Sequence, residues 1–264
     1  MRRELREELA VEVGAATRLM TVVEPRDGFN LHLQAWRTLA CRGTPQVREH
    51  QAVDWVKPED FPIARMPPAD LPIARALQLP RQYLITPDAR ALSAADLRAG
   101  IQRALARGIR MIRLRCADID ARLSAQMLRD CEQLITDVGG RLLVDLADYP
   151  HCRHAGTGVH LRSSQIAQFC RRAIPDASLL IASCHNVEQL IAAEFAGCDA
   201  AVVSPVAATS SHPDATTLGW DGFGRLHDRS NLPFYALGGM TAGDLGPAIR
   251  HGAIGIAAIR ALWQ

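Results

Sequence analysis

The stretch FYALGGM at residues 234–240, together with GAIGIAAI at residues 252–259, decides the fold that this sequence predicts. Each stretch contains an apolar run that is too short for a helix and is typical of a buried strand. The first run ends in Gly238 and Gly239, where the missing Cβ lets the backbone approach a ligand closely. Two adjacent parallel strands that end in exposed backbone amides form a cup for an anion, so we expect phosphate to bind here.

Apolar runs of this kind alternate with longer amphipathic segments throughout residues 82–264. Eight runs are predicted to be strands, at residues 83–86, 111–115, 141–144, 158–161, 179–183, 200–204, 234–237 and 254–257. Helices are expected between them, at residues 94–107, 121–138, 164–173, 187–196, 220–227 and 242–250. The alternation indicates an α/β protein with a parallel sheet, and eight strands favour a closed (β/α)8, or TIM, barrel over an open doubly wound sheet.

The composition bounds the partners and the compartment. A formal charge of +2 over 264 residues gives no reason to expect a nucleic acid polymer or an anionic membrane, and no apolar segment approaches the roughly 20 residues of a membrane span. The seven cysteines are scattered and odd in number, which favours reduced thiols in the cytoplasm over a disulfide framework. We therefore expect a cytoplasmic protein whose partner is a small molecule that carries phosphate. Nothing in the sequence specifies an oligomeric state.

The N-terminal part, residues 1–79, has a different pattern. Helices are expected over residues 1–13 and 69–79, and strands over residues 19–23 and 29–36. Three glutamates of the first helix, at i, i+3 and i+4, share one face: Glu4, Glu7 and Glu8. A Mg2+ ion between them would relieve their repulsion, and pairing with arginines of the same helix is the alternative. No Gly/Ser linker separates this part from the barrel, so we expect the two to lie close together.

The string RELREELAV at residues 3–11 resembles the second half of the Nudix box, R-E-U-x-E-E-x-G-U, with Ala10 in place of the glycine. Residues 46–56 and 66–73 are similar to the closing strand and the last helix of the MutT branch of that family, which hydrolyses 8-oxo-dGTP to the monophosphate and pyrophosphate. The resemblance covers residues 1–79 and implies an α+β Nudix domain.

This resemblance also implies roles for individual residues. The ligands that hold Mg2+ around a pyrophosphate and activate water would be Glu4, Glu7, Glu8 and Glu49, with Glu49 also catalytic. Asp70 takes the place of the asparagine that reads the oxidised base, and an ionised carboxylate cannot donate the amide hydrogen bond. The first half of the box, G-x5-E, has no counterpart, either because the start site is set too late or because the domain is truncated. We therefore expect an incomplete Nudix domain without diphosphatase activity.

Five strings in the barrel part resemble the thiamine phosphate synthase and TenI superfamily in content and order. They are YLIT at 83–86, GVHL at 158–161, IASCH at 181–185, SPVAAT at 204–209 and ALGGM at 236–240. The resemblance covers residues 82–264. The synthase joins a pyrimidine pyrophosphate to a thiazole phosphate with the help of Mg2+, whereas TenI enzymes isomerise a thiazole phosphate by proton transfer. A Nudix domain followed by such a barrel is a known fusion, so each resemblance supports the other.

The barrel resemblance implies which residues bind and react. Phosphate would be bound at the carboxyl ends of the strands by Arg115, Ser183, Thr209, Gly238, Gly239, Ala258 and Ile259. His185 falls on the histidine that moves the proton in TenI enzymes, and a hydrogen-bonding role within its loop is the alternative. Arg115 could equally form an ion pair with Asp118.

The chain also departs from the synthase pattern. RLRCA at residues 113–117 keeps the arginine of Q-L-R-x-K but not the lysine, Gln165 replaces an aspartate, and His212 replaces a lysine. The aspartate after the third strand falls on Leu146, or on Asp145 if one gap is allowed. These losses predict phosphate binding without full synthase activity and weaken the case for Mg2+ in the barrel. Two alternatives stay open: a non-catalytic barrel that steadies or regulates the Nudix domain, and a longer parent that is chiefly an 8-oxo-dGTP or nucleoside triphosphate diphosphatase.

Overall fold

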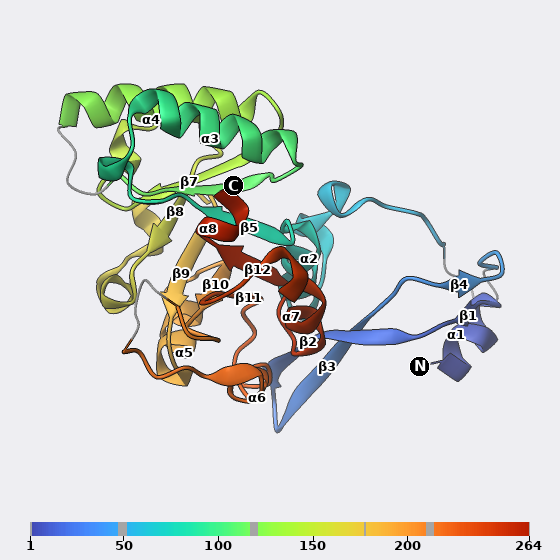
Figure 1. The fold of residues 1–264 in the computed structure, drawn as a ribbon. Coiled ribbons are helices and arrows are strands. Elements are labelled where there is room, and N and C mark those ends of the chain that lie inside the picture. Colours follow the sequence, from blue (N-terminus) through green and yellow to red (C-terminus); the bar gives the residue numbers. More distant parts are fainter. Residues whose placement is uncertain (1, 47–51, 117–120, 177, 210–213, 264) are drawn as a thin grey trace.

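Eight parallel strands form one closed barrel in the computed structural model, which describes residues 2–46, 52–116, 121–176, 178–209 and 214–263 (Figure 1). The strands are β5 (Gln82–Ile85), β6 (Met111–Leu114), β7 (Arg141–Asp145), β8 (Gly158–Leu161), β9 (Leu180–Cys184), β10 (Ala200–Val203), β11 (Phe234–Ala236) and β12 (Gly255–Ala258). β12 pairs with β5, with Ala257 opposite Tyr83, and this pairing closes the barrel. The eight predicted strands and the barrel are therefore confirmed, and the open sheet is excluded.

Helices follow most of the strands and cover the outside of the barrel. They are α3 (Ala94–Ala106), α4 (Ala121–Thr136), α5 (Val187–Phe195), α6 (Gly219–Gly224), α7 (Leu245–Arg250) and α8 (Arg260–Trp263). α3 begins as the sequence predicts, because the Oγ of Ser93 accepts a hydrogen bond of 3.1 Å from the backbone N–H of Asp96. In the described part of the chain, no helix is both long and apolar enough to span a membrane.

Short 3-10 segments complete the barrel: η4 (Ala89–Ala91), η5 (Tyr149–His151), η6 (Ser163–Gln168), η7 (Arg171–Ala173) and η8 (Ala242–Asp244). The α-helix expected at residues 164–173 is wrong, since η6 and η7 occupy that stretch. The two side chains of this stretch that pack on the core near its start, Ile166 and Phe169, lie three residues apart. Three residues is the repeat of a 3-10 helix, so this spacing favours the tighter turn.

Alternation along the strands divides the core into two layers. Leu84 and Ile112 point outward and pack in the layer between sheet and helices. Their neighbours point into the barrel, where the interior is filled by Tyr83, Met111, Leu143, Ile181, Val202, Tyr235 and Ala257. The barrel interior is therefore a packed core, and the two cavities described below lie where loops surround the carboxyl ends of the strands.

The N-terminal part is an extended hairpin with short helices beside it (Figure 1). Its elements are α1 (Arg2–Leu9), β1 (Glu12–Val13), β2 (Ala16–Arg26), β3 (Phe29–Thr38), β4 (Cys41–Arg42), η1 (Pro58–Asp60), η2 (Ile63–Arg65), η3 (Pro68–Asp70) and α2 (Leu71–Gln78). β2 and β3 pair antiparallel, so the two predicted strands and the closing helix are confirmed. The first helix ends at Leu9 rather than at residue 13, because Ala10 has a left-handed φ of 57° that an α-helix cannot continue.

β2 closes the amino end of the barrel with apolar side chains. Leu19, Met20 and Val22 are buried in the same cluster as the interior residues Tyr83 and Tyr235. The hairpin therefore completes the barrel core instead of standing apart from it.

Polar contacts fix the hairpin in this position. The side-chain amide of Asn231 accepts a hydrogen bond of 2.7 Å from the N–H of Val23 and donates one of 3.0 Å to the Val23 carbonyl. The Nε2 of His227 lies 3.2 Å from the carbonyl oxygen of Leu19. The expectation that the two parts lie close together is confirmed.

Candidate phosphate-binding site

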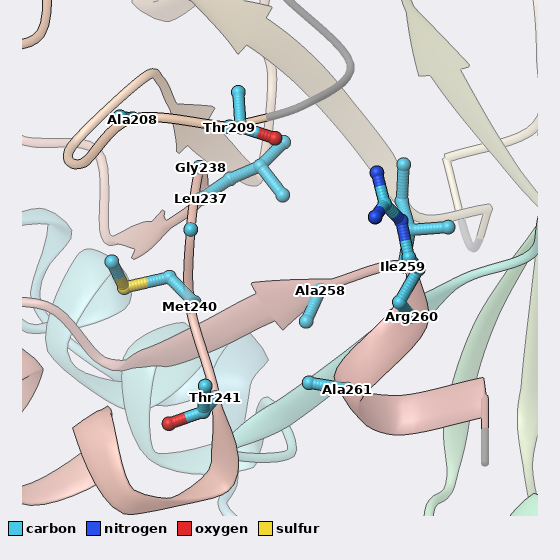
Figure 2. A pocket seen from close by; sticks show the side chains of 11 residues that line it. Ala208, Thr209, Leu237, Gly238, Met240, Thr241, Ala258, Ile259, Arg260 and Ala261 are labelled. Atoms are coloured by element: carbon cyan, nitrogen blue, oxygen red, sulfur yellow. The ribbon is translucent and has the colours of Figure 1, made fainter.

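Two adjoining cavities lie at the carboxyl ends of the barrel strands. The smaller, of about 270 Å³, lies between the segments that follow β11 and β12 (Figure 2). The larger, of about 900 Å³, extends across the ends of the other strands. The two cavities share the lining residues Thr209, Leu237, Gly238 and Ile259. A single ligand can therefore place one end in the small cavity and its body in the large one.

The small cavity depends on two glycines directly after β11. Gly238 and Gly239 have φ values of 99° and 69°, in the left-handed region that favours glycine. A Cβ on Gly239 would lie 2.8 Å from the carbonyl oxygen of Ala208, so the loop carrying Thr209 packs directly against this backbone. Ala258 and Ile259 line the opposite side (Figure 2). The structure thus brings together five of the residues predicted to bind phosphate.

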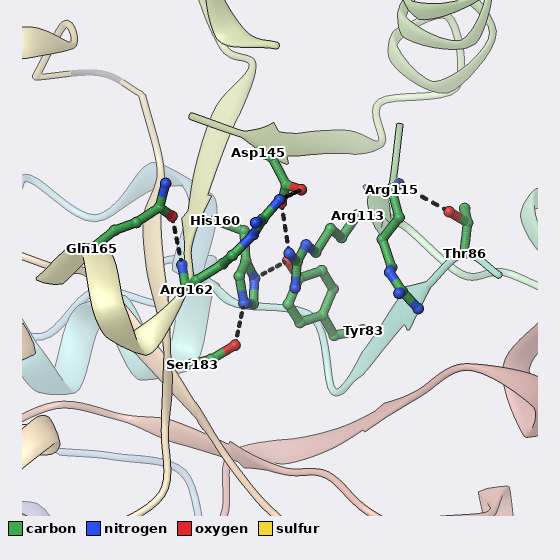
Figure 3. A network of polar contacts seen from close by, with 9 residues as sticks. All are labelled: Tyr83, Thr86, Arg113, Arg115, Asp145, His160, Arg162, Gln165 and Ser183. Atoms are coloured by element: carbon green, nitrogen blue, oxygen red, sulfur yellow. Dashed lines mark hydrogen bonds and ion pairs between the residues drawn. The ribbon is translucent and has the colours of Figure 1, made fainter. Parts of the chain in front are cut away.

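A buried row of hydrogen bonds leads to the larger cavity (Figure 3). The Oη of Tyr83 lies 2.8 Å from Nδ1 of His160, and Nε2 of His160 lies 2.8 Å from Oγ of Ser183. Tyr83 and His160 are fully buried, whereas Ser183 is partly exposed and lines the cavity. The position of the predicted phosphate ligand Ser183 is therefore fixed from inside the barrel.

Burial determines the protonation states along this row. It lowers the pKa of His160 well below its usual value, with the charge of Arg113 as the second cause, and it raises the pKa of Tyr83. A neutral imidazole has one donor and one acceptor nitrogen, so we assign the Tyr83 hydroxyl as donor to Nδ1 and Nε2–H as donor to Ser183. The hydroxyl proton of Ser183 is then available to a ligand.

Asp145 lies at the end of β7 between two arginines (Figure 3). Its Oδ1 is 2.5 Å from a terminal nitrogen of Arg113, and its Oδ2 is 3.3 Å from one of Arg162. Leu146 instead packs against the outer core. Of the two positions considered for the aspartate after the third strand, Asp145 is the one that faces the cavity.

These donors do not fit Mg2+ in the barrel. Both oxygens of Asp145 are engaged by guanidinium groups, which a divalent cation would have to displace. The side-chain oxygen of Gln165 accepts a hydrogen bond of 2.9 Å from the backbone N–H of Arg162.

The other two predicted residues of the barrel also line the large cavity. The backbone N–H of Arg115 donates to Oγ1 of Thr86 at 3.1 Å, and its side chain reaches the cavity. Nδ1 of His185 lies 2.8 Å from the carbonyl oxygen of Ser204, so it carries the proton and Nε2 is left as an acceptor. His185 thus makes the loop hydrogen bond that one interpretation expects, through Nδ1, and its side chain also lines the cavity, as the proton-transfer interpretation requires. Asp118 lies outside the described residues.

The residues predicted from the Nudix resemblance are elsewhere. Glu4, Glu7 and Glu8 are exposed on α1, and Glu7 lies 3.8 Å from Arg3. Asp70 ends η3 next to Ala69, which packs at the amino end of the barrel, opposite the cavities. Glu49, like His212 of the barrel, lies outside the described residues. The four-glutamate metal site stays a prediction.

Sequence reasoning missed the roles of Tyr83, His160, Arg113 and Arg162. The available signal was a polar residue inside an apolar strand run, as in GVHL at residues 158–161 and MIRL at 111–114. Such a side chain must point either into the barrel or toward the helices, and it needs a buried partner in either case.

The fold and the cavities define a (β/α)8 barrel that can hold an anion at the ends of its last two strands. Residues 82–262 match the sequence model of the thiamine monophosphate synthase family. The chain is 28% identical over 183 residues to a putative thiamine-phosphate synthase 2 of Aquifex aeolicus, covering 69% of this chain and 97% of that one. It is 32% identical to a putative thiamine-phosphate synthase of Geobacter sulfurreducens, covering 68% and 85%. The chain belongs to the thiamine monophosphate synthase family.

Two further comparisons concern the fold and the N-terminal part. Thiamine phosphate pyrophosphorylase from Pyrococcus furiosus has the same fold, with a TM-score of 0.56 and 22% identity over 68% of this chain and 85% of that one. A CTP pyrophosphohydrolase of Escherichia coli is 39% identical over 77 residues, which are 28% of this chain and 55% of that protein. The second similarity covers too little of the relative to show a family.

Proposed function

We propose that the barrel binds a thiazole phosphate, or a closely related phosphate ester, and isomerises it by proton transfer. The observation that carries the proposal is the small cavity at Gly238 and Gly239, which opens into a larger one lined by His185. The phosphate occupies the small cavity, where Thr209 and the backbone of Ala258 and Ile259 surround it. The ring then extends into the larger cavity.

Proton transfer suits the groups that line this cavity. Nε2 of His185 takes a proton from one atom of the ring and returns it to another, so one base serves both steps. The Ser204 carbonyl holds Nδ1–H and fixes the orientation of the imidazole. The hydroxyl of Ser183, which lines the larger cavity, donates a hydrogen bond to the part of the ligand held there. This reaction requires no divalent metal, which agrees with the engaged state of Asp145.

Titration of thiazole phosphate into the wild type and His185→Asn tests this function. Since His185 acts on the ring rather than the phosphate, we expect a dissociation constant within about 3-fold of wild type and a loss of at least about 100-fold in ring-proton exchange. Calorimetry measures binding, and proton NMR in D2O measures exchange. His32→Asn, on the exposed face of β3, is the matched control. Absence of binding would refute the site, and binding without exchange in the wild type would favour the non-catalytic barrel.

We also propose that residues 1–79 derive from a MutT-type Nudix domain whose hairpin packs on the barrel formed by residues 82–264. The 77-residue similarity to a CTP pyrophosphohydrolase supports this origin. Ala10 supports it further, because it stands at the glycine position of the box and has φ 57°. In the parent fold, Glu4, Glu7, Glu8 and Glu49 would hold Mg2+, and Asp70 would face the base.

An assay with 8-oxo-dGTP and Mg2+ tests whether this part retains activity. α1 buries no residue and its three glutamates are exposed, so a metal bound between them would face solvent and would not be enclosed with a pyrophosphate. We expect no release of pyrophosphate above the rate without enzyme. Release that requires Mg2+ and is abolished in Glu8→Gln would contradict this expectation and favour the diphosphatase alternative.

A further inference from the structure

Three arginine side chains line the larger cavity, and none of the three lines the small cavity at the glycine cup. Among the described residues, the charged side chains that line this cavity are Asp88, Arg113, Arg115, Asp145 and Arg162. Three cations and two anions leave one net positive charge among these side chains. The cavity therefore favours an anion at this end as well as at the cup.

Arg113 has unused hydrogen-bonding capacity. It is only 9% exposed, and one terminal nitrogen bonds Asp145, yet its Nε–H has no hydrogen-bond partner among the described residues. A buried donor of a charged group without a partner is costly, whereas an anion in the cavity would supply one.

Arg162 is the adjustable member of the cluster. Its side chain is 57% exposed, and its contact with Asp145 is 3.3 Å, longer than the 2.5 Å contact of Arg113. Gln165 secures the backbone of Arg162 and leaves the guanidinium free to turn toward a ligand. A planar guanidinium can bind phosphate or carboxylate oxygens in pairs.

We propose that Arg113 and Arg162 take the place of a divalent cation at this end of the cavity: they hold Asp145 as an internal counter-ion and, with Arg115, bind an anion without a metal. The inference rests on the proposed function only for the assignment of the first phosphate to the cup. The guanidinium groups supply the charge that a divalent cation would otherwise bring.

Binding of inorganic pyrophosphate, measured by calorimetry in EDTA and then in MgCl2, tests the proposal. We expect binding in EDTA that Mg2+ does not strengthen, because the arginines supply the positive charge. Arg162→Gln and Arg115→Gln should each weaken it at least about 10-fold, by loss of a charge-assisted hydrogen bond. Arg229→Gln, exposed on a loop outside the cavity lining, should leave it unchanged. Pyrophosphate binding that requires Mg2+, or that is unchanged in both Arg162→Gln and Arg115→Gln, would overturn the proposal.

Asp145→Asn gives a result of opposite sign for the two kinds of site. If Asp145 is a counter-ion, its neutralisation releases both guanidinium groups and pyrophosphate binds more tightly. If Asp145 is instead a metal ligand, the same substitution weakens the binding of pyrophosphate. Circular dichroism shows whether Asp145→Asn is folded. If it is not, the pyrophosphate affinities of Arg162→Gln and Arg115→Gln test the proposal in its place. Arg162→Gln should still bind thiazole phosphate through the cup. If the wild type does not bind thiazole phosphate but binds pyrophosphate in an arginine-dependent way, the proposed function is refuted and the proposal for the arginines still holds.

Discussion

Met20→Asp is expected to lower the free energy of unfolding by about 4 kcal/mol, because it buries a carboxylate without a partner. Met20 is 4% exposed and lies in a cluster whose described members are all apolar or aromatic. That cluster includes Tyr83 and Tyr235 of the barrel interior as well as Leu19 and Val22 of β2. A charge on the hairpin therefore affects the barrel as much as the N-terminal part.

Urea unfolding followed by both circular dichroism and tryptophan fluorescence measures this effect. We expect one transition that shifts as a whole, since hairpin and barrel share a core. Leu39→Asp is the matched control, because Leu39 follows β3 and is 90% exposed, and its unfolding free energy should stay within about 0.5 kcal/mol of wild type. An early transition of the hairpin alone, with the barrel transition unmoved, would show that the two parts are independent.

The barrel could be predicted because its signal is local. Each strand is a short apolar run between amphipathic helices, and the count of eight is decisive once the alternation is seen. The glycine cup follows from the same reasoning, since Gly238 and Gly239 come directly after the seventh run. All five predicted ligands of the cup lie at the ends of strands or in the loops that follow them, which the topology alone brings to one end.

The remaining parts of the site depend on pairs that are far apart in the chain. Arg113 meets Asp145 across neighbouring strands, and Tyr83 meets His160 through the barrel interior. No local periodicity indicates which polar residue faces which partner, because that depends on the stagger of the strands in the closed sheet. The packing of β2 on the barrel cannot be predicted from local sequence for the same reason, since Val23 of β2 bonds Asn231, which lies 208 residues away in the chain.

Gly238→Ala is expected to weaken binding of thiazole phosphate at least about 10-fold and to lower the free energy of unfolding by about 3 kcal/mol. Gly238 has φ 99°, a conformation that costs an L-residue strain, and a Cβ there would lie 2.8 Å from Cα of Pro205 and 3.1 Å from the backbone N of Val206. Both contacts are backbone atoms, so no side-chain rotation can relieve them and the loop itself must move. Because Gly238 lines both cavities, any such movement deforms the cup.

Gly243→Ala separates this local effect from a general loss of glycine. Gly243 lies in η8, a few residues beyond the cup, and the nearest atom to an added Cβ is Oγ1 of Thr241 at 3.6 Å, an ordinary contact. The unfolding free energy of Gly243→Ala and its affinity for thiazole phosphate should therefore match wild type, whereas both quantities fall in Gly238→Ala. Affinity has to be compared at temperatures where each variant is fully folded, since unfolding alone would reduce apparent binding. Wild-type affinity in folded Gly238→Ala would mean that the phosphate does not occupy the cup, and Ser183 with the arginine cluster would then be the remaining place for it.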